Sequence, residues 1–182
     1  MSLDRPLDPA LQEAGQLGLE ARVRQGDHAS LKLWLRMLAC TTQIETEIRS
    51  RLRREFGVSL ARFDYLAQLY RHSEGLKMRE LSRQLMVTGG NVTGLTDELE
   101  REGMVLRESS PTDRRSWLVS LTPKGRSEFA RMAEAHEQWL QAMFGGLDPA
   151  VIAQLHDQLG QLRVQLLKPV APPDAAPGEE VA

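Results

Sequence analysis

Residues 76–126 decide the fold, and they read LKMRELSRQLMVTGGNVTGLTDELEREGMVLRESSPTDRRSWLVSLTPKGR. Apolar residues recur twice in this stretch at positions i, i+3 and i+7, which is the spacing of one apolar helix face. They are Met78, Leu81 and Leu85 in the first group, and Val92, Leu95 and Leu99 in the second. Thr88 stands where it can cap the second helix, and Gly103 stands where a glycine ends one. The stretch therefore predicts two helices joined by a short turn.

The first turn of the second predicted helix carries small or polar side chains. They belong to Thr88, Gly89, Gly90, Asn91, Thr93 and Gly94. A helix that enters the DNA major groove needs an exposed first turn with hydrogen-bond donors and little bulk, because its backbone must come close to the bases. This turn meets that requirement, although a merely flexible helix start would explain the same composition.

A β-hairpin with a basic tip is predicted after the two helices. Residues 104–108 and 117–121 have the apolar or alternating pattern of strands, and the turn formers at 109–116 include Arg114 and Arg115. Helix, turn, helix and hairpin is the order of a winged helix-turn-helix, whose second helix enters the major groove and whose hairpin reaches the backbone or the minor groove. The alternative is a hairpin tip that is simply solvated.

Three segments resemble the signature of the MarR (multiple antibiotic resistance regulator) family: ELEREGMV at 98–105, PTDRR at 111–115 and VSLTPKG at 119–125. The resemblance covers about residues 28–168 and implies a dimeric bacterial repressor that releases DNA when a small molecule binds. Around SLARFD at 59–64 and TGGNVTG at 88–94, the chain is most similar to members that control aromatic-acid breakdown. Those members respond to hydroxybenzoates, hydroxycinnamates or their coenzyme A thioesters.

Composition limits the class of protein. The chain has 182 residues, 41% of them hydrophobic, and no apolar run approaches the roughly 20 residues that span a bilayer, so we expect a cytoplasmic protein without a membrane partner. A single cysteine, Cys40, excludes an intramolecular disulfide and a Cys-rich zinc site. The net charge is −2, but between residues 76 and 126 nine basic residues outnumber seven acidic ones. The case for DNA binding therefore depends on where the charges lie.

The fold class expected is mainly α with a small β-hairpin: a winged helix-turn-helix domain plus a helical dimerisation domain formed by the N- and C-terminal helices. Cap residues predict helix starts at Asp27, Ser59, Thr122 and Asp148. The domains expected are an N-terminal extension (1–27), a dimerisation helix (28–57), the winged helix-turn-helix domain (58–126), C-terminal dimerisation helices (127–168) and a disordered tail (169–182). The extension is either a loose tail or an arm that wraps a second subunit.

An apolar stripe near the C-terminus predicts a homodimer. Its residues are Ile152, Leu155, Leu159, Leu162 and Leu166. Steps of three and four residues in alternation are typical of a coiled-coil contact, and one small DNA-binding unit has no room to bury such a stripe. Two subunits related by a two-fold axis would place two equivalent helices about 34–36 Å apart, so the DNA site expected is an inverted-repeat operator.

The side chains expected to contact DNA belong to three groups. Asn91 can pair with adenine through its amide, Thr88 and Thr93 can contact a thymine methyl or a phosphate, and Gly90 lets the backbone approach. Arg79 and Arg83 lie on the polar side of the first helix. The resemblance implies that Arg115 enters the minor groove, with Asp113 supporting it and Arg114 on a phosphate.

The resemblance also implies an effector pocket between the dimerisation helices and the DNA-binding unit. An aromatic carboxylate needs a cation and an apolar wall, and Arg36 or Arg62 with Trp34, and His28 as a donor, offer these groups. Ordinary surface or packing roles are the alternative for each of the four. An oxidant-sensing repressor acting through Cys40 is a further alternative, although a small buried side chain is the favoured interpretation of that cysteine.

The sequence does not indicate an enzyme. The four histidines share no metal-ligand spacing with Cys or carboxylates, and the chain has no phosphate-binding loop and no nucleophile motif. No cofactor and no metal site are expected. A helical adaptor that does not bind DNA is the main competing interpretation, and the arginine-tipped hairpin beside a glycine-rich helix start argues against it.

Overall fold

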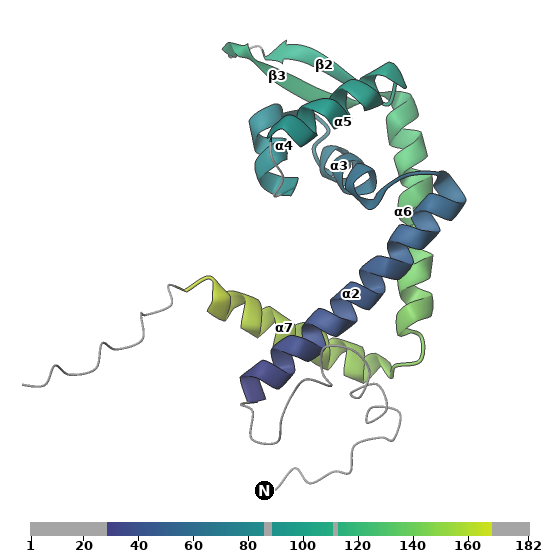
Figure 1. The fold of residues 1–182 in the computed structure, drawn as a ribbon, viewed down its shortest axis with the longest axis vertical. Coiled ribbons are helices and arrows are strands. Elements are labelled where there is room, and N and C mark those ends of the chain that lie inside the picture. The colour runs from purple at the N-terminus through teal and green to yellow at the C-terminus, as the bar shows by residue number, and fades with distance from the viewer. Residues whose placement is uncertain (1–28, 86–88, 111–112, 169–182) are drawn as a thin grey trace, which may run out of the picture. The chain divides into compact units, whose positions relative to one another are not determined.

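The computed structural model describes residues 29–85, 89–110 and 113–168. These residues form two compact units, one up to His136 and one from Glu137 onward. The first unit contains α2 (Ala29–Phe56), α3 (Leu60–Arg71), β1 (Leu76–Lys77), α4 (Met78–Leu85), α5 (Gly89–Arg101), β2 (Val105–Ser110), β3 (Asp113–Leu121) and most of α6 (Pro123–Phe144) (Figure 1). The second unit contains the end of α6 and α7 (Pro149–Leu166). The predicted extension, tail and caps at Asp27 and Thr88 lie outside the described residues.

The predicted helix starts are confirmed wherever the structure describes them. The Ser59 hydroxyl accepts a hydrogen bond from the Arg62 backbone N–H at 3.2 Å, and the Asp148 carboxylate accepts one from the Ala150 N–H at 2.7 Å. These bonds satisfy N–H groups that have no partner inside the helix. After α5, Gly103 has a φ of +69°, the left-handed conformation that ends many helices.

The predicted hairpin is confirmed, but the sheet has a third strand that the sequence did not reveal. The order is β1-β3-β2, and both pairs are antiparallel. Strand β1 has only two residues, Leu76 and Lys77, which pair with Val119 and Leu118. Two residues directly before a helix show no alternation, so only their partner strand identifies them as a strand.

The predicted turn at 109–116 is wrong in extent. Strand β2 continues to Ser110, and β3 begins at Asp113. Ser109 pairs with Trp117, but the next residue of β2, Ser110, pairs with Asp113. The register therefore shifts between these two pairs. Residues 114–116 therefore form an irregularity in β3, of the kind that leaves extra residues on one strand of a pair. The polar residues of this segment have the composition of a turn, whereas backbone pairing continues almost to the tip.

The core of the first unit fixes the orientation of α5. Val92 and Leu99 are buried on one face of this helix, and Thr96 between them is fully buried. The Thr96 hydroxyl lies 2.6 Å from the Tyr65 hydroxyl of α3 and donates to the Val92 carbonyl at 2.7 Å. Burial raises the pKa of Tyr65 to about 12, so this phenol keeps its proton at any physiological pH.

The described part of α2 departs from one expectation. Cys40 is exposed within the single chain, although the sequence favoured a buried side chain. Leu31, Leu33 and Trp34 of the same helix are also exposed, at 44%, 54% and 55%. Within the described residues, none of the helices is both long enough and apolar enough to cross a bilayer.

Candidate nucleic-acid interface

The first turn of α5 is open to solvent on the face opposite the core. Gly90, Asn91 and Thr93 are exposed there. The Asn91 side chain makes no hydrogen bond within the described part of the chain. A Cβ added at Gly90 or Gly94 would have no atom within 4 Å outside the helix's own neighbouring backbone. Packing inside the chain therefore does not require these glycines, and they leave room for an external partner to approach the helix.

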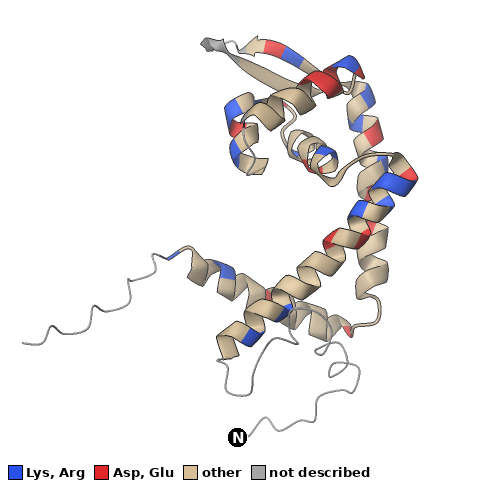
Figure 2. Ribbon diagram, viewed as in Figure 1, with Lys and Arg blue, Asp and Glu red and all other residues tan. Residues whose placement is uncertain are grey.

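Two exposed arginines lie on α4, the helix before α5. Arg79 and Arg83 are four residues apart, which places them on the same side of the helix. Neither forms an ion pair among the described residues. Figure 2 shows this basic colouring on α4.

The hairpin formed by β2 and β3, here called the wing, carries the predicted arginines. Asp113, Arg114 and Arg115 are the first three residues of β3. Arg114 and Arg115 fall in the irregular part of the ladder between β2 and β3. The chain thus has its basic pair at the far end of the wing, as the sequence predicts, but in a strand. Thr88, the remaining residue predicted to contact DNA, lies outside the described residues.

The acidic residues of α5 are concentrated in its second half (Figure 2), and basic side chains of other elements pair with two of them and with Glu102 just after the helix. Arg107 of β2 pairs with Asp97 and Glu100 at 2.8 and 2.7 Å. Arg62 of α3 forms two hydrogen bonds with Glu102, and hydrogen bonding from Arg62 lowers the pKa of that carboxyl group. The first turn of α5 has no acidic residue that would repel DNA phosphates.

The residues predicted to bind an effector are not brought together by the described chain. Arg62 is engaged with Glu102. Trp34 and Arg36 are exposed on α2, and His28 lies outside the described residues. Arg62 is therefore already paired with a carboxylate of the chain, and the assignment of the other three residues to an effector site stays a prediction.

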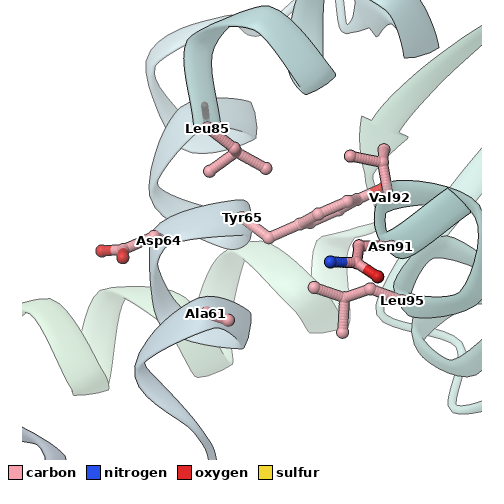
Figure 3. A pocket seen from close by; sticks show the side chains of 7 residues that line it. All are labelled: Ala61, Asp64, Tyr65, Leu85, Asn91, Val92 and Leu95. Carbon is pink, nitrogen blue, oxygen red and sulfur yellow. The ribbon is translucent and has the colours of Figure 1, made fainter. Parts of the chain in front are cut away.

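A cavity of about 340 Å³ lies instead between α3, the end of α4 and the start of α5 (Figure 3). Its lining residues are Ala61, Asp64, Tyr65, Leu85, Asn91, Val92 and Leu95. In Figure 3 the Asp64 carboxylate points away from the other labelled side chains. Asn91 belongs both to this lining and to the open face of α5. Sequence reasoning missed the cavity because its walls come from three separate helices, and periodicity says nothing about how helices meet.

An exposed, small-faced helix that follows a second helix and precedes a β-hairpin defines a winged helix-turn-helix DNA-binding protein. Comparison with known proteins agrees, because the family model described as MarR family matches residues 58–117. A MarR family transcriptional regulator from Silicibacter pomeroyi has a crystal structure that superposes with a TM-score of 0.64 at 31% identity, over 75% of this chain and 94% of the other. The chain belongs to the MarR family.

Other relatives are more distant or less well described. An uncharacterised HTH-type transcriptional regulator of Bacillus subtilis, YkoM, is 33% identical over 115 residues, which are 63% of this chain and 70% of that protein. The regulator BldR of Sulfolobus solfataricus has the same fold, with a TM-score of 0.66 at 23% identity over 78% of this chain and 99% of that one. The protein is therefore a DNA-binding transcriptional regulator and not an enzyme, and the adaptor interpretation is excluded.

Proposed function

We propose that the protein is a homodimeric repressor that binds an inverted-repeat operator and leaves it when a small aromatic molecule binds. The observation that carries the proposal is the first turn of α5, which is exposed, small and uncharged while the opposite face of the helix is buried. Each subunit inserts this turn into a major groove and places its wing on the flanking backbone or minor groove. Because its proposed partner is chromosomal DNA, we place the protein in the cytoplasm.

Apolar surface on α7 supports the dimer. None of its residues is buried in the single chain, and Ile152, Leu155 and Leu159 are 41%, 45% and 47% exposed. Leu166 extends the same stripe and is 69% exposed. A contiguous apolar stripe on a soluble protein marks an interaction site, and its coiled-coil spacing fits a second copy of the same helix.

DNA contacts in this proposal are divided between bases and backbone. Asn91 reads a base, because its amide is exposed and has no partner within the described chain. Arg79 and Arg83 bind phosphates, since they are exposed cations on the neighbouring helix. A gel shift with the DNA upstream of the protein's own coding region tests the proposal. Retention of a palindromic fragment over a scrambled one is expected, and equal retention of both would contradict sequence-specific binding.

Arg115→Ala tests the wing. We expect affinity for the operator to fall about 10-fold, because the variant cannot form one charge-assisted interaction with DNA. The slope of log K against log salt should flatten by about one unit, since one fewer phosphate is neutralised. Arg71→Ala removes the same charge from the exposed end of α3 and serves as the control. An Arg115→Ala slope equal to that of the wild type would remove the wing from the interface.

The effector is proposed to bind in the cavity beside Asn91. Its volume of about 340 Å³ lies at the small end of the range of about 300–1,000 Å³ typical of small-molecule sites, which suits one or two rings. Since Asn91 is shared by the cavity and the open face of α5, an occupant competes with DNA for this side chain.

The charge of the lining supports one of the two kinds of ligand that the resemblance suggested. Among the seven lining residues the one charged group is Asp64, whose pKa is raised by burial and by the nearby Glu45. A free carboxylate would lose water here without gaining a cation, which is costly. The coenzyme A thioester of an aromatic acid has no carboxylate on the ring side, so we favour it over the acid.

A panel of matched ligands tests this choice by thermal shift and by release from the operator. The aryl thioester and the aryl amide are expected to raise the melting temperature and release DNA, whereas the corresponding free acid has a smaller effect at neutral pH. Asp64→Asn should improve binding of the acid, because the lining loses its negative charge. A larger rise in melting temperature with the acid than with the amide would contradict the conclusion that the cavity disfavours a negatively charged ligand.

A further inference from the structure

Arg107 connects the wing to α5 through two carboxylates. Its Nη2 atom lies 2.8 Å from Asp97 Oδ1 and 2.7 Å from Glu100 Oε2. The Arg107 side chain is 24% exposed and the two acids are 46% and 34% exposed, so solvent screens these ion pairs only in part. The two acids are three residues apart on α5, so they lie on the same side of the helix and both face β2. This cluster adds charged contacts between α5 and the wing to the apolar packing that they share.

Trp117 adds a second contact on the same side of the sheet. The Arg107 guanidinium lies 5.7 Å from the centre of the Trp117 ring, within the range of a cation–π interaction. In an antiparallel sheet the two residues of a cross-strand pair point to the same face, and so does every second pair along the strands. Arg107 pairs with Val119, and Ser109 pairs with Trp117. These four side chains therefore lie on the face of the sheet that is turned toward α5. Trp117 directly follows the irregular residues 114–116. Through Arg107, the link from α5 therefore extends to Trp117, two residues after Arg115.

A rigid link matters because the wing and α5 bind one DNA molecule at two places. Once α5 has bound DNA, the wing binds the same DNA molecule at an effective concentration that depends on how well the wing is held at the right distance and angle from α5. A β-hairpin has little stability of its own, so its orientation must come from contacts with the rest of the domain. On the sheet face toward α5, Arg107 supplies ion pairs in addition to the apolar packing of Val105 and Val119.

We propose that Arg107 is a positioning residue for DNA recognition, which holds the wing at a fixed angle to α5 without contacting DNA itself. The proposal rests on the wing contact described under Proposed function. It differs from a purely electrostatic role, in which Arg107 would only neutralise Asp97 and Glu100 so that they do not repel phosphates.

The first experiment compares Arg107→Gln with Arg131→Gln, which removes the same charge from an exposed site on α6. Affinity for the palindromic duplex is measured over a range of salt concentrations, below the melting temperature of each variant.

We expect Arg107→Gln to lose on the order of 10- to 100-fold in affinity. Its salt slope should flatten by about one unit for each phosphate that the misplaced wing leaves unbound. Arg107→Lys, which keeps the charge but not the planar fork, should fall between it and the wild type. Wild-type affinity and slope in Arg107→Gln would overturn the proposal.

The triple variant Asp97→Asn, Glu100→Gln, Arg107→Gln separates positioning from charge. It lacks both acids that Arg107 neutralises, so an electrostatic role predicts full recovery of affinity, which would overturn the proposal. The positioning role predicts that affinity stays low. Adding Arg115→Ala to Arg107→Gln should then cost almost nothing more, because the wing is already misplaced. If Arg115→Ala alone binds like the wild type while Arg107→Gln binds weakly, then Arg115 is not a DNA contact, and Arg107 positions another part of the wing. If both variants bind like the wild type, the wing contact and the positioning role are both wrong.

Discussion

Gly125→Ala is expected to lower the free energy of unfolding by about 3 kcal/mol, the upper part of the range for overpacked sites. A Cβ built at Gly125 would lie 1.9 Å from the Met104 carbonyl oxygen and 2.9 Å from its carbon. Both are backbone atoms at the junction between α5 and β2, so no side-chain rotation relieves the clash. Urea unfolding followed by circular dichroism measures the loss.

The region around Gly125 explains why the backbone cannot move away. The Thr122 hydroxyl donates to the Gly103 carbonyl at 2.7 Å and accepts from the Gly125 N–H at 3.0 Å. The Lys124 ammonium donates to the Glu102 carbonyl at 2.8 Å. The start of α6 therefore satisfies carbonyls that the end of α5 leaves without helical partners, and any shift of Gly125 breaks these bonds.

Gly94→Ala is the matched control for this prediction. It makes the same chemical change in a helix, but its Cβ would meet no atom within 4 Å. Alanine is the better helix former, so Gly94→Ala should stabilise the fold by about 0.5–1 kcal/mol. Equal stability of the two variants would mean that the contact between the start of α6 and Met104 is looser than described.

The double substitution Leu155→Glu, Leu159→Glu is expected to convert the protein to a monomer and to abolish detectable operator binding. Both leucines lie on the exposed apolar stripe of α7. Charges facing each other across a dimer interface repel, and a single subunit keeps only one of the two half-site contacts. We expect at least about a 100-fold loss of affinity, since linked sites gain about 10²–10⁴-fold over single ones. Light scattering gives the mass, and a gel shift gives the binding.

Gln154→Glu with Gln158→Glu is the control for the dimer prediction. These residues are exposed on α7 outside the stripe, and they add the same two charges to the same helix. This variant should stay dimeric and bind DNA. If the leucine variant also stays dimeric, then α7 is not the interface, and the apolar surface of α2 around Trp34 becomes the site to test.

Features that depend on neighbouring residues were predictable from the sequence. The caps at Ser59 and Asp148 bond to backbone groups only two or three residues away, so the local residue types determine them. The apolar spacing of α4 and α5 likewise fixed which side of each helix is buried, as Leu81 and Val92 show. The exposed first turn of α5 was predicted for the same reason.

Features that depend on distant partners were not predictable. Arg62 was expected near a ligand because it is a cation close to an apolar helix, but its partner Glu102 lies 40 residues away. Strand β1 likewise exists only because it pairs with the distant strand β3, and the contacts of Arg107 exist only because α5 meets the sheet. Residue type indicates which groups need a partner, whereas the tertiary fold selects which one they find.

The two ends of α5 are under different constraints, and this has a consequence for how such a regulator acquires new targets. Its C-terminal end is fastened by Arg62, Thr122 and Lys124. At its N-terminal end, Gly90, Asn91 and Gly94 face open space. Mutations at the open end can change promoter choice while the domain keeps its stability. A randomised library confined to these three positions should therefore yield well-folded variants with altered DNA preference, and natural divergence is expected to follow the same route.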